Sequence, residues 1–139
     1  MGVVNFFNEE IEFKIAHPRK TARWIEKAVA NEKTQIKALN IIFCSDEYLG
    51  QINLEYLNHK TLTDIITFDQ GGSRVSLEGD IFISIPRVQD NAVKFNVAFD
   101  QELHRVIIHG VLHLLGYDDK SEAKKKVMRK KEDAYLSLR

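Results

Sequence analysis

Residues 100–119 read DQELHRVIIHGVLHLLGYDD, and this stretch decides the fold that the sequence predicts. Apolar side chains nearly surround a helix over 100–115, which is typical of a helix buried at the centre of a domain. These side chains belong to Val106, Ile107, Ile108, Val111, Leu112, Leu114 and Leu115. Gly116 then ends the helix and lets the chain turn back. The other elements are therefore expected to pack around this central helix.

Outward from this helix, strands and helices intermix without a regular strand–helix–strand rhythm. Short apolar runs at 3–7 and 11–15 predict one or two strands at the edge of the sheet. Further runs predict strands at 36–44, 63–68 and 81–85, with 36–44 in the interior of the sheet. Helical spacing and start signals predict helices over 18–31, from 46 to about 57, over 86–96 and from 121 towards 138. The polar residues at 70–78 predict a loop. We therefore expect an α+β fold in which helices cover a mixed sheet of about four strands, with a hairpin-like N-terminus at the sheet edge.

The composition is that of an ordinary globular protein. The 139 residues are 44% hydrophobic and 29% charged, and they predict one domain spanning 1–139. The 20 basic and 20 acidic residues cancel, so any contact with nucleic acid has to come from local clusters of charge. One cysteine, Cys44, excludes an internal disulfide and fits a reducing compartment. Because no signal-peptide pattern and no apolar run of roughly 20 residues is found, we expect a cytoplasmic protein without membrane contact.

Two histidines of the central helix, His109 and His113, are four residues apart. This spacing places both imidazoles on one helix face, where they can reach one divalent metal ion at about 2.0–2.1 Å each. Asp119 follows the helix-ending glycine and offers a carboxylate as a third ligand. The pattern predicts one metal ion per chain with an open coordination position, Zn²⁺ first and Mn²⁺ or another divalent ion as alternatives. Two hydrogen-bonded core histidines are the other interpretation of such a pair.

Zinc peptidases use a related pattern, His-Glu-x-x-His, in which the glutamate is the general base. Gly110 stands at the position of that glutamate. A peptidase without its base is badly impaired, so the sequence disfavours proteolysis. His104, nine residues before His113, is expected to point away from the metal ligands.

The stretch HGVLHLLGYD at 109–118 closely resembles the signature of the YbeY family of rRNA maturation factors. Further upstream, LEY at 54–56 with TDIITF at 63–68, and GDIFIS at 79–84, are similar to two further blocks of that family. The chain length and the order of elements also fit. The resemblance therefore covers essentially the whole chain.

The resemblance implies a metal-dependent endoribonuclease that cleaves single-stranded RNA. Its expected role is rRNA maturation, at the 3′ end of small-subunit rRNA, and ribosome quality control, with the small ribosomal subunit as a partner. The three predicted ligands would hold the metal ion, which would polarise a phosphoryl oxygen, activate a water molecule, or do both. Asp118, Asp80 and Asp64 are candidates for the general base, and each also suits a turn, a cap or a backbone hydrogen bond.

Two positions depart from the family pattern. Asp119 stands where the family usually has a third histidine, and its negative charge predicts weaker Lewis acidity and easier acceptance of Mn²⁺ than three imidazoles would give. Leu57 stands where the family usually has an arginine that serves RNA binding or catalysis. Lys60 and Arg74 are nearby cations that can take over contacts to phosphate.

A run of six basic residues lies within 124–131. On a helix, Lys125, Lys126, Arg129 and Lys130 share one side, which is either a solvated surface or a patch for the RNA backbone. Three functions stay open at this point. They are an endoribonuclease, a non-catalytic ribosome-assembly factor with a structural metal, and a metallopeptidase.

Overall fold

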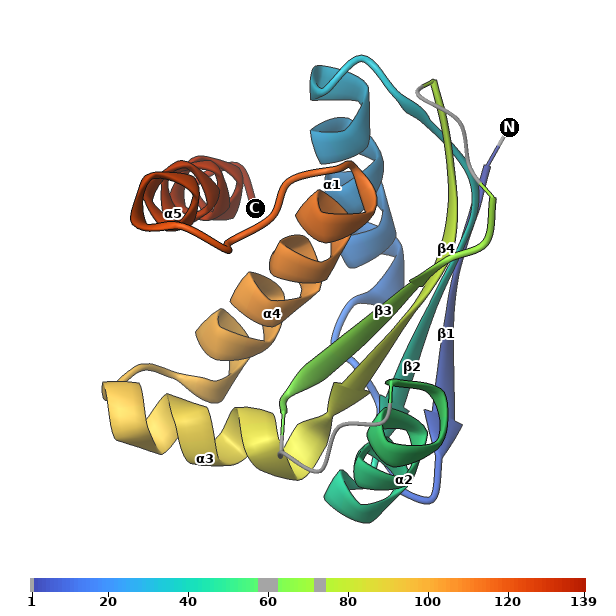
Figure 1. Cartoon of the computed structure of the whole chain (residues 1–139), viewed down its shortest axis with the longest axis vertical. Coiled ribbons are helices and arrows are strands. Elements are labelled where there is room, and N and C mark those ends of the chain that lie inside the picture. Colours follow the sequence, from blue (N-terminus) through green and yellow to red (C-terminus); the bar gives the residue numbers. More distant parts are fainter. Residues whose placement is uncertain (1, 58–62, 72–74) are drawn as a thin grey trace.

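The computed structural model describes residues 2–57, 63–71 and 75–139. The strands of these ranges are β1 Val3–Glu9, β2 Gln35–Cys44, β3 Ile65–Asp69 and β4 Ser76–Ser84. The helices are α1 Pro18–Asn31, α2 Asp46–Leu57, α3 Ile85–Phe95, α4 Phe99–Leu114 and α5 Glu122–Leu136. Figure 1 shows the sheet with α1 and α4 along it and α5 packed beyond α4. In the described part of the chain, no helix has both the length and the apolar character needed to cross a bilayer.

The sheet has the strand order β1-β2-β4-β3. β1 is parallel to β2 and β2 is parallel to β4, while β3 runs antiparallel to β4. The predicted α+β fold with a mixed four-stranded sheet is therefore confirmed, as is the interior position of the strand at 36–44.

The prediction of a hairpin-like N-terminus is wrong, and of the two apolar runs predicted to form one or two strands only the first forms one. Glu10 has a positive φ of 56°, and the chain leaves the sheet there. Ile15 is buried, and Ile11 and Phe13 pack against the core from a segment without strand structure. These apolar side chains therefore contribute to the core without strand pairing. The chain returns through α1, so that β2 pairs with β1 in parallel.

The polar loop is shorter than the sequence predicts, because β4 begins at Ser76. Ser76, Leu77 and Glu78 extend the parallel ladder with β2. Ser76 and Glu78 are only partly buried, whereas Leu77 lies in the core. Polar residues in this part of the strand alternate with buried ones, and this alternation is compatible with a sheet face that is not fully covered.

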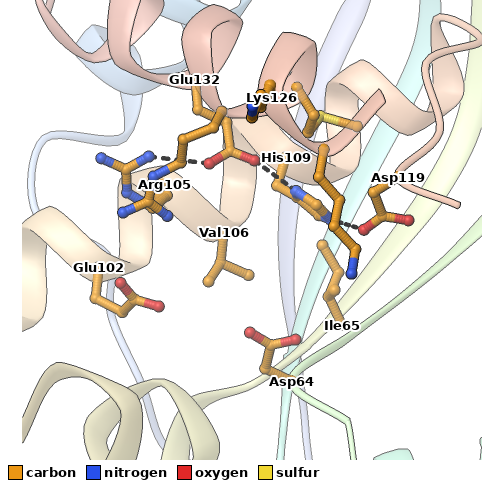
Figure 2. Close-up of a pocket in the computed structure, with 12 residues that line it drawn as sticks. Asp64, Ile65, Glu102, Arg105, Val106, His109, Asp119, Lys126 and Glu132 are labelled. Carbon is orange, nitrogen blue, oxygen red and sulfur yellow. Dashed lines mark hydrogen bonds and ion pairs between the residues drawn. The ribbon is translucent and has the colours of Figure 1, made fainter. Parts of the chain in front are cut away.

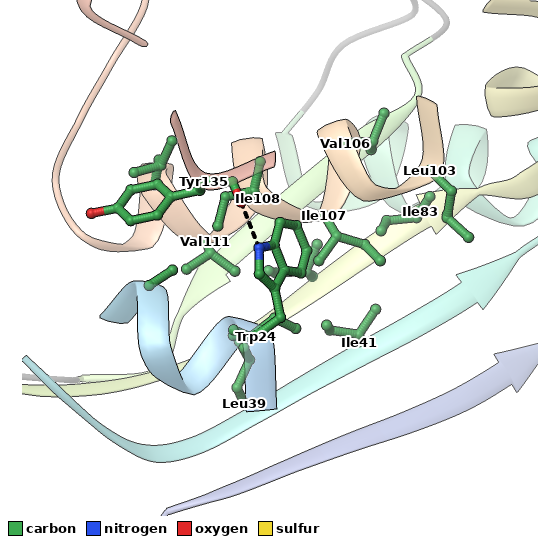
Figure 3. Close-up of a cluster of buried hydrophobic side chains, with 14 of the residues drawn as sticks. Trp24, Leu39, Ile41, Ile83, Leu103, Val106, Ile107, Ile108, Val111 and Tyr135 are labelled. Atoms are coloured by element: carbon green, nitrogen blue, oxygen red, sulfur yellow. Dashed lines mark hydrogen bonds between the residues drawn. The ribbon is translucent and has the colours of Figure 1, made fainter. Parts of the chain in front are cut away.

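Helices pack on both faces of the sheet. Figure 3 shows the larger core, in which Trp24 of α1 lies among side chains of the sheet and of α4. The Nε1–H group of Trp24 donates to the carbonyl oxygen of Tyr135 at 2.7 Å and so joins α1 to α5. On the other face, Leu49 and Ile52 of α2 pack with Ile66 of β3 in a second, smaller cluster.

Gly110 allows α4 to approach the sheet closely. A Cβ atom at this buried position would lie 2.7 Å from Cδ1 of Ile65 and 3.0 Å from Cγ2 of Ile81. The first distance is shorter than real Cβ contacts and the second is tighter than most of them, so a larger side chain here requires Ile65 and Ile81 to shift. Glycine lets α4 pack against the sheet without such shifts.

The C-terminus of α4 is closed by Gly116, which has a positive φ of 106°. The Gly116 N–H group donates to the carbonyl oxygen of His113, and that of Tyr117 donates to Leu112, both at 3.0 Å. These two bonds are the pair that defines a Schellman motif. The helix end and the reversal of the chain agree with the prediction from sequence.

Candidate metal centre

Three side chains from α4 and the loop after it converge. The Nε2 atoms of His109 and His113 are 2.9 Å apart, and Oδ2 of Asp119 lies 3.7 Å from the first and 3.9 Å from the second. Ligands of a tetrahedral ion at 2.0–2.1 Å would be separated by about 3.3 Å, so only small shifts are needed. Within the described residues, this is the group of His, Cys, Asp or Glu side chains close enough to hold a metal ion. The structure thus brings together the three ligands predicted from sequence.

Glu132 of α5 orients His109. Its Oε2 atom lies 2.6 Å from Nδ1 of His109, and its Oε1 atom accepts from Nη1 of Arg105 at 2.9 Å (Figure 2). A carboxylate at Nδ1 keeps the proton on that nitrogen, which leaves the Nε2 lone pair directed toward Asp119 and His113. A second partner of this kind is a regular feature of histidines that bind metals.

The two histidines differ in their protonation. Burial lowers the pKa of His113, and the neighbouring His109 lowers it further. Burial acts in the same direction on His109, but the hydrogen bond and charge of Glu132 outweigh it and raise the pKa of His109. Only the neutral imidazole binds a metal, so a proton and a metal ion compete for Nε2 of His109.

The donor set fits a divalent metal ion. Two imidazoles and one carboxylate are a known ligand set of catalytic Zn²⁺, and they leave a fourth position for water or substrate. The side chains are partly accessible, at 24% for His109, 27% for His113 and 44% for Asp119. A substrate can therefore approach the cluster from solvent.

Next to the cluster lies a cavity of about 470 Å³, which His109 and Asp119 line together with α5. Lys125, Lys126 and Arg129 form its cationic wall. Lys130, the fourth basic residue predicted to face RNA, is exposed and does not line this cavity.

Two further carboxylates, Asp64 and Glu102, line the same cavity, and Figure 2 shows both on the side away from Lys126. Burial raises the pKa of both groups. Oδ2 of Asp64 accepts a hydrogen bond from Asn91 at 3.2 Å. The cavity therefore has a cationic wall, an acidic floor and the predicted metal ligands beside them.

Asp118 and Asp80, the other two candidates for the general base, have partners elsewhere. Asp118 accepts from Nζ of Lys124 at 3.1 Å. Asp80 accepts from Nδ2 of Asn40 at 3.0 Å. Neighbouring strand residues face opposite ways, and Ile81 faces α4, so the sheet lies between Asp80 and the metal ligands.

Lys60 and Arg74 lie outside the described residues, and Leu57 ends α2.

His104 points away from the cluster, as the sequence predicts. Its Nδ1 atom lies 2.6 Å from the carbonyl oxygen of Asp100.

Sequence reasoning missed Glu132, Glu102 and Arg105. Glu102 and Arg105 precede His109 by seven and four residues, so helical spacing alone places them on its face. Glu132 follows His109 by 23 residues, and no local pattern connects the two. Only the packing of α5 against α4 brings them together.

Comparison with known proteins shows the family of this chain. A family model described as Endoribonuclease YbeY matches residues 4–138. The chain belongs to the YbeY endoribonuclease family. The family and the fold expected from the resemblance are thereby confirmed.

Relatives in the YbeY family match along nearly their whole length. The Endoribonuclease YbeY of Christiangramia forsetii is 49% identical over 137 residues, covering 99% of this chain and 94% of the relative. That of Amoebophilus asiaticus is 47% identical over 133 residues, covering 96% and 90%. The solution structure of a Thermotoga maritima protein has a TM-score of 0.68 at 26% identity and covers 97% of this chain and 87% of its own.

Proposed function

We propose that this YbeY-family protein is a metal-dependent endoribonuclease that cleaves single-stranded RNA in rRNA maturation, at the 3′ end of small-subunit rRNA, and in ribosome quality control. Residues 1–139 act as one domain, in the cytoplasm, with the small ribosomal subunit as partner. One observation carries the proposal: the metal ligands His109 and Asp119 and three cations of α5 line the same cavity. A phosphodiester in this cavity lies beside both the metal site and positive charge.

His109, His113 and Asp119 would hold the ion, for which Zn²⁺ is the first candidate and Mn²⁺ the second. When bound, the ion supplies Lewis acidity toward a phosphoryl oxygen or a water molecule. Glu132 keeps Nε2 of His109 available, and Arg105 neutralises Glu132 in its buried position. The anionic carboxylate of Asp119 favours a harder ion than a third imidazole would.

The cations of α5 position the RNA backbone. Lys125, Lys126 and Arg129 neutralise phosphates, and this contact is independent of base sequence. Repulsion between RNA and the acidic floor of the cavity keeps the backbone on the α5 side.

Of the three candidates for the general base, Asp64 has the most suitable position. It lines the cavity with His109, whereas neither Asp118 nor Asp80 lines this cavity. A carboxyl with a raised pKa is a better proton acceptor near neutral pH than an ordinary one. In this role Asp64 takes a proton from the attacking water.

The test is cleavage of a labelled single-stranded RNA by purified, metal-loaded protein, with casein as a second substrate. We expect cleavage of RNA only, lost on chelation and in His113→Ala, and retained in His17→Asn, which changes an exposed histidine at the start of α1. Metal at one ion per chain without cleavage of either substrate would instead support the assembly factor. Hydrolysis of casein would support a peptidase.

A further inference from the structure

Glu102 is a buried carboxylate without a direct partner. Its side chain lines the cavity, and the residue is only 6% exposed. Across the described residues, no hydrogen bond and no ion pair within 4.0 Å reaches this carboxylate. Glu132 lines the same cavity and is equally buried, but Arg105 and His109 hold it. The two glutamates of this cavity therefore differ in how their charge is satisfied.

Among the described residues no fully buried side-chain oxygen lacks a partner, so the Glu102 carboxylate is open to the cavity and available to a ligand there. Burial raises the pKa of Glu102, the charge of Asp64 raises it further, and Arg105 and Arg129 oppose the shift without touching the carboxylate. A ligand that brings N–H donors to Glu102 would satisfy it. Figure 2 shows Glu102 and Asp64 directed toward the same part of the cavity, below Val106.

A second metal ion is a poor candidate for this ligand. Among the described residues, neither Glu102 nor Asp64 belongs to a group of three side chains close enough to bind an ion. Lys125, Lys126 and Arg129 also line this cavity, and their charges repel a cation. The missing partner is therefore expected to be a neutral donor.

Single-stranded RNA contains such donors at the edges of its bases. Unstacked bases of single-stranded RNA are bound in pockets and recognised through their Watson–Crick edges. Guanine presents two neighbouring donors there, N1–H and N2–H, which match the two oxygens of a carboxylate. Glu102 lies two helical turns from His109, about 10.5 Å along α4, which is comparable to the span from a phosphate to the edge of its own base.

We propose that the Glu102 end of this cavity is a nucleobase subsite, in which the Glu102 carboxylate accepts hydrogen bonds from a guanine beside the scissile phosphate. The proposal rests on the endoribonuclease function proposed above. The phosphate lies toward the cations of α5 and the metal ligands, and the base lies toward the acidic floor.

The test compares short single-stranded RNAs that contain one guanosine, one inosine or one uridine in an otherwise uniform uridine sequence. Inosine keeps N1–H and lacks the amino group. For wild-type protein with metal, we expect cleavage next to guanosine to be about 5- to 100-fold faster than next to uridine, with inosine between them. Glu102→Gln replaces one acceptor by a donor and is expected to abolish this preference while the RNA is still cleaved.

Glu26→Gln is the control, because Glu26 is exposed on α1, does not line the cavity and is reached by no hydrogen bond or ion pair within the described residues. Should Glu102→Gln fail to fold, binding of GMP and IMP to wild-type protein gives an independent measurement, with GMP expected to bind more tightly. Equal cleavage next to all three bases, or equal binding of GMP and IMP, would overturn the guanine subsite alone. A second bound metal ion that Glu102→Gln removes would overturn it as well. If no RNA is cleaved at all, the proposed function fails instead.

Discussion

The Oε2 atom of Glu132 lies 2.6 Å from Nδ1 of His109, although the two residues are 23 positions apart. This contact joins α5, which carries three cations of the cavity, to α4, which carries two of the three predicted metal ligands. On α4, Nη1 of Arg105 donates a hydrogen bond to the other carboxylate oxygen of Glu132, Oε1, at 2.9 Å. The metal centre therefore depends on the docking of α5 as well as on the local motif.

Glu132→Gln is expected to lower the affinity for Zn²⁺ by about 10- to 100-fold, because the amide is a weaker acceptor for His109 Nδ1–H. Competition with a chromophoric chelator measures this affinity without reference to activity. Asp133→Asn is the control, since Asp133 contacts Arg105 at 2.7 Å and does not contact His109. Equal affinities of wild type and Glu132→Gln would contradict the orienting role.

Asp119→Ala is expected to lower metal affinity further than Glu132→Gln does, because it removes a ligand rather than the partner of one. Elemental analysis of purified protein provides the measurement. Asp118→Ala changes the adjacent carboxylate, which contacts Lys124, and is expected to leave the metal content unchanged. If the two variants retain the same metal content, Asp119 is not a ligand.

Asp119→His tests the charge of the site. Three neutral imidazoles leave more positive charge on a bound ion than two imidazoles and a carboxylate, so water is polarised more strongly. We expect the acid limb of the pH–rate profile for RNA cleavage to shift to lower pH. A profile unchanged from wild type would show that the charge of this ligand does not control the rate.

Lys125→Ala and Arg129→Ala are expected to weaken the binding of single-stranded RNA of any sequence, because both residues line the cavity as cations. Each lost phosphate contact should also reduce the slope of log K against log salt by about 0.7. Lys130→Ala is the comparison on the same helix, at an exposed position that does not line the cavity. If all three variants behave alike, α5 acts through net charge alone.

Much of the fold follows from local patterns, and so does the metal cluster. The spacing of His109 and His113 and the glycine that ends α4 predict the ligand geometry, because helix periodicity and a positive φ are local properties. The run at 11–15 shows the limit, since its apolar residues enter the core without joining the sheet. Strand pairing and the Glu132 contact depend on residues that are distant in sequence, so no local pattern contains them.

Glu32 links the end of α1 to the loop that carries Asp119. Its carboxylate accepts hydrogen bonds from the hydroxyl groups of Tyr117 and Tyr135 and from Nζ of Lys131. Burial by itself raises the pKa of the Glu32 carboxyl, but these three donors outweigh it and lower the pKa below its ordinary value of 4.5. The charged carboxylate therefore stabilises the folded state.

The folded-state pKa of Glu32 is the lower one, so its contribution to stability is present above pH 4.5 and is lost as the pH falls through the folded value. Glu32→Gln is expected to reduce the free energy of unfolding at pH 7 by about 1–3 kcal/mol. The difference from wild type should shrink as the pH falls below 4.5, which urea unfolding at several pH values measures. Glu26→Gln, within α1, is the control, because no hydrogen bond or ion pair within the described residues reaches Glu26. A Glu32→Gln effect that is the same at every pH would show that the charge of Glu32 contributes nothing to the link between α1 and the loop of Asp119.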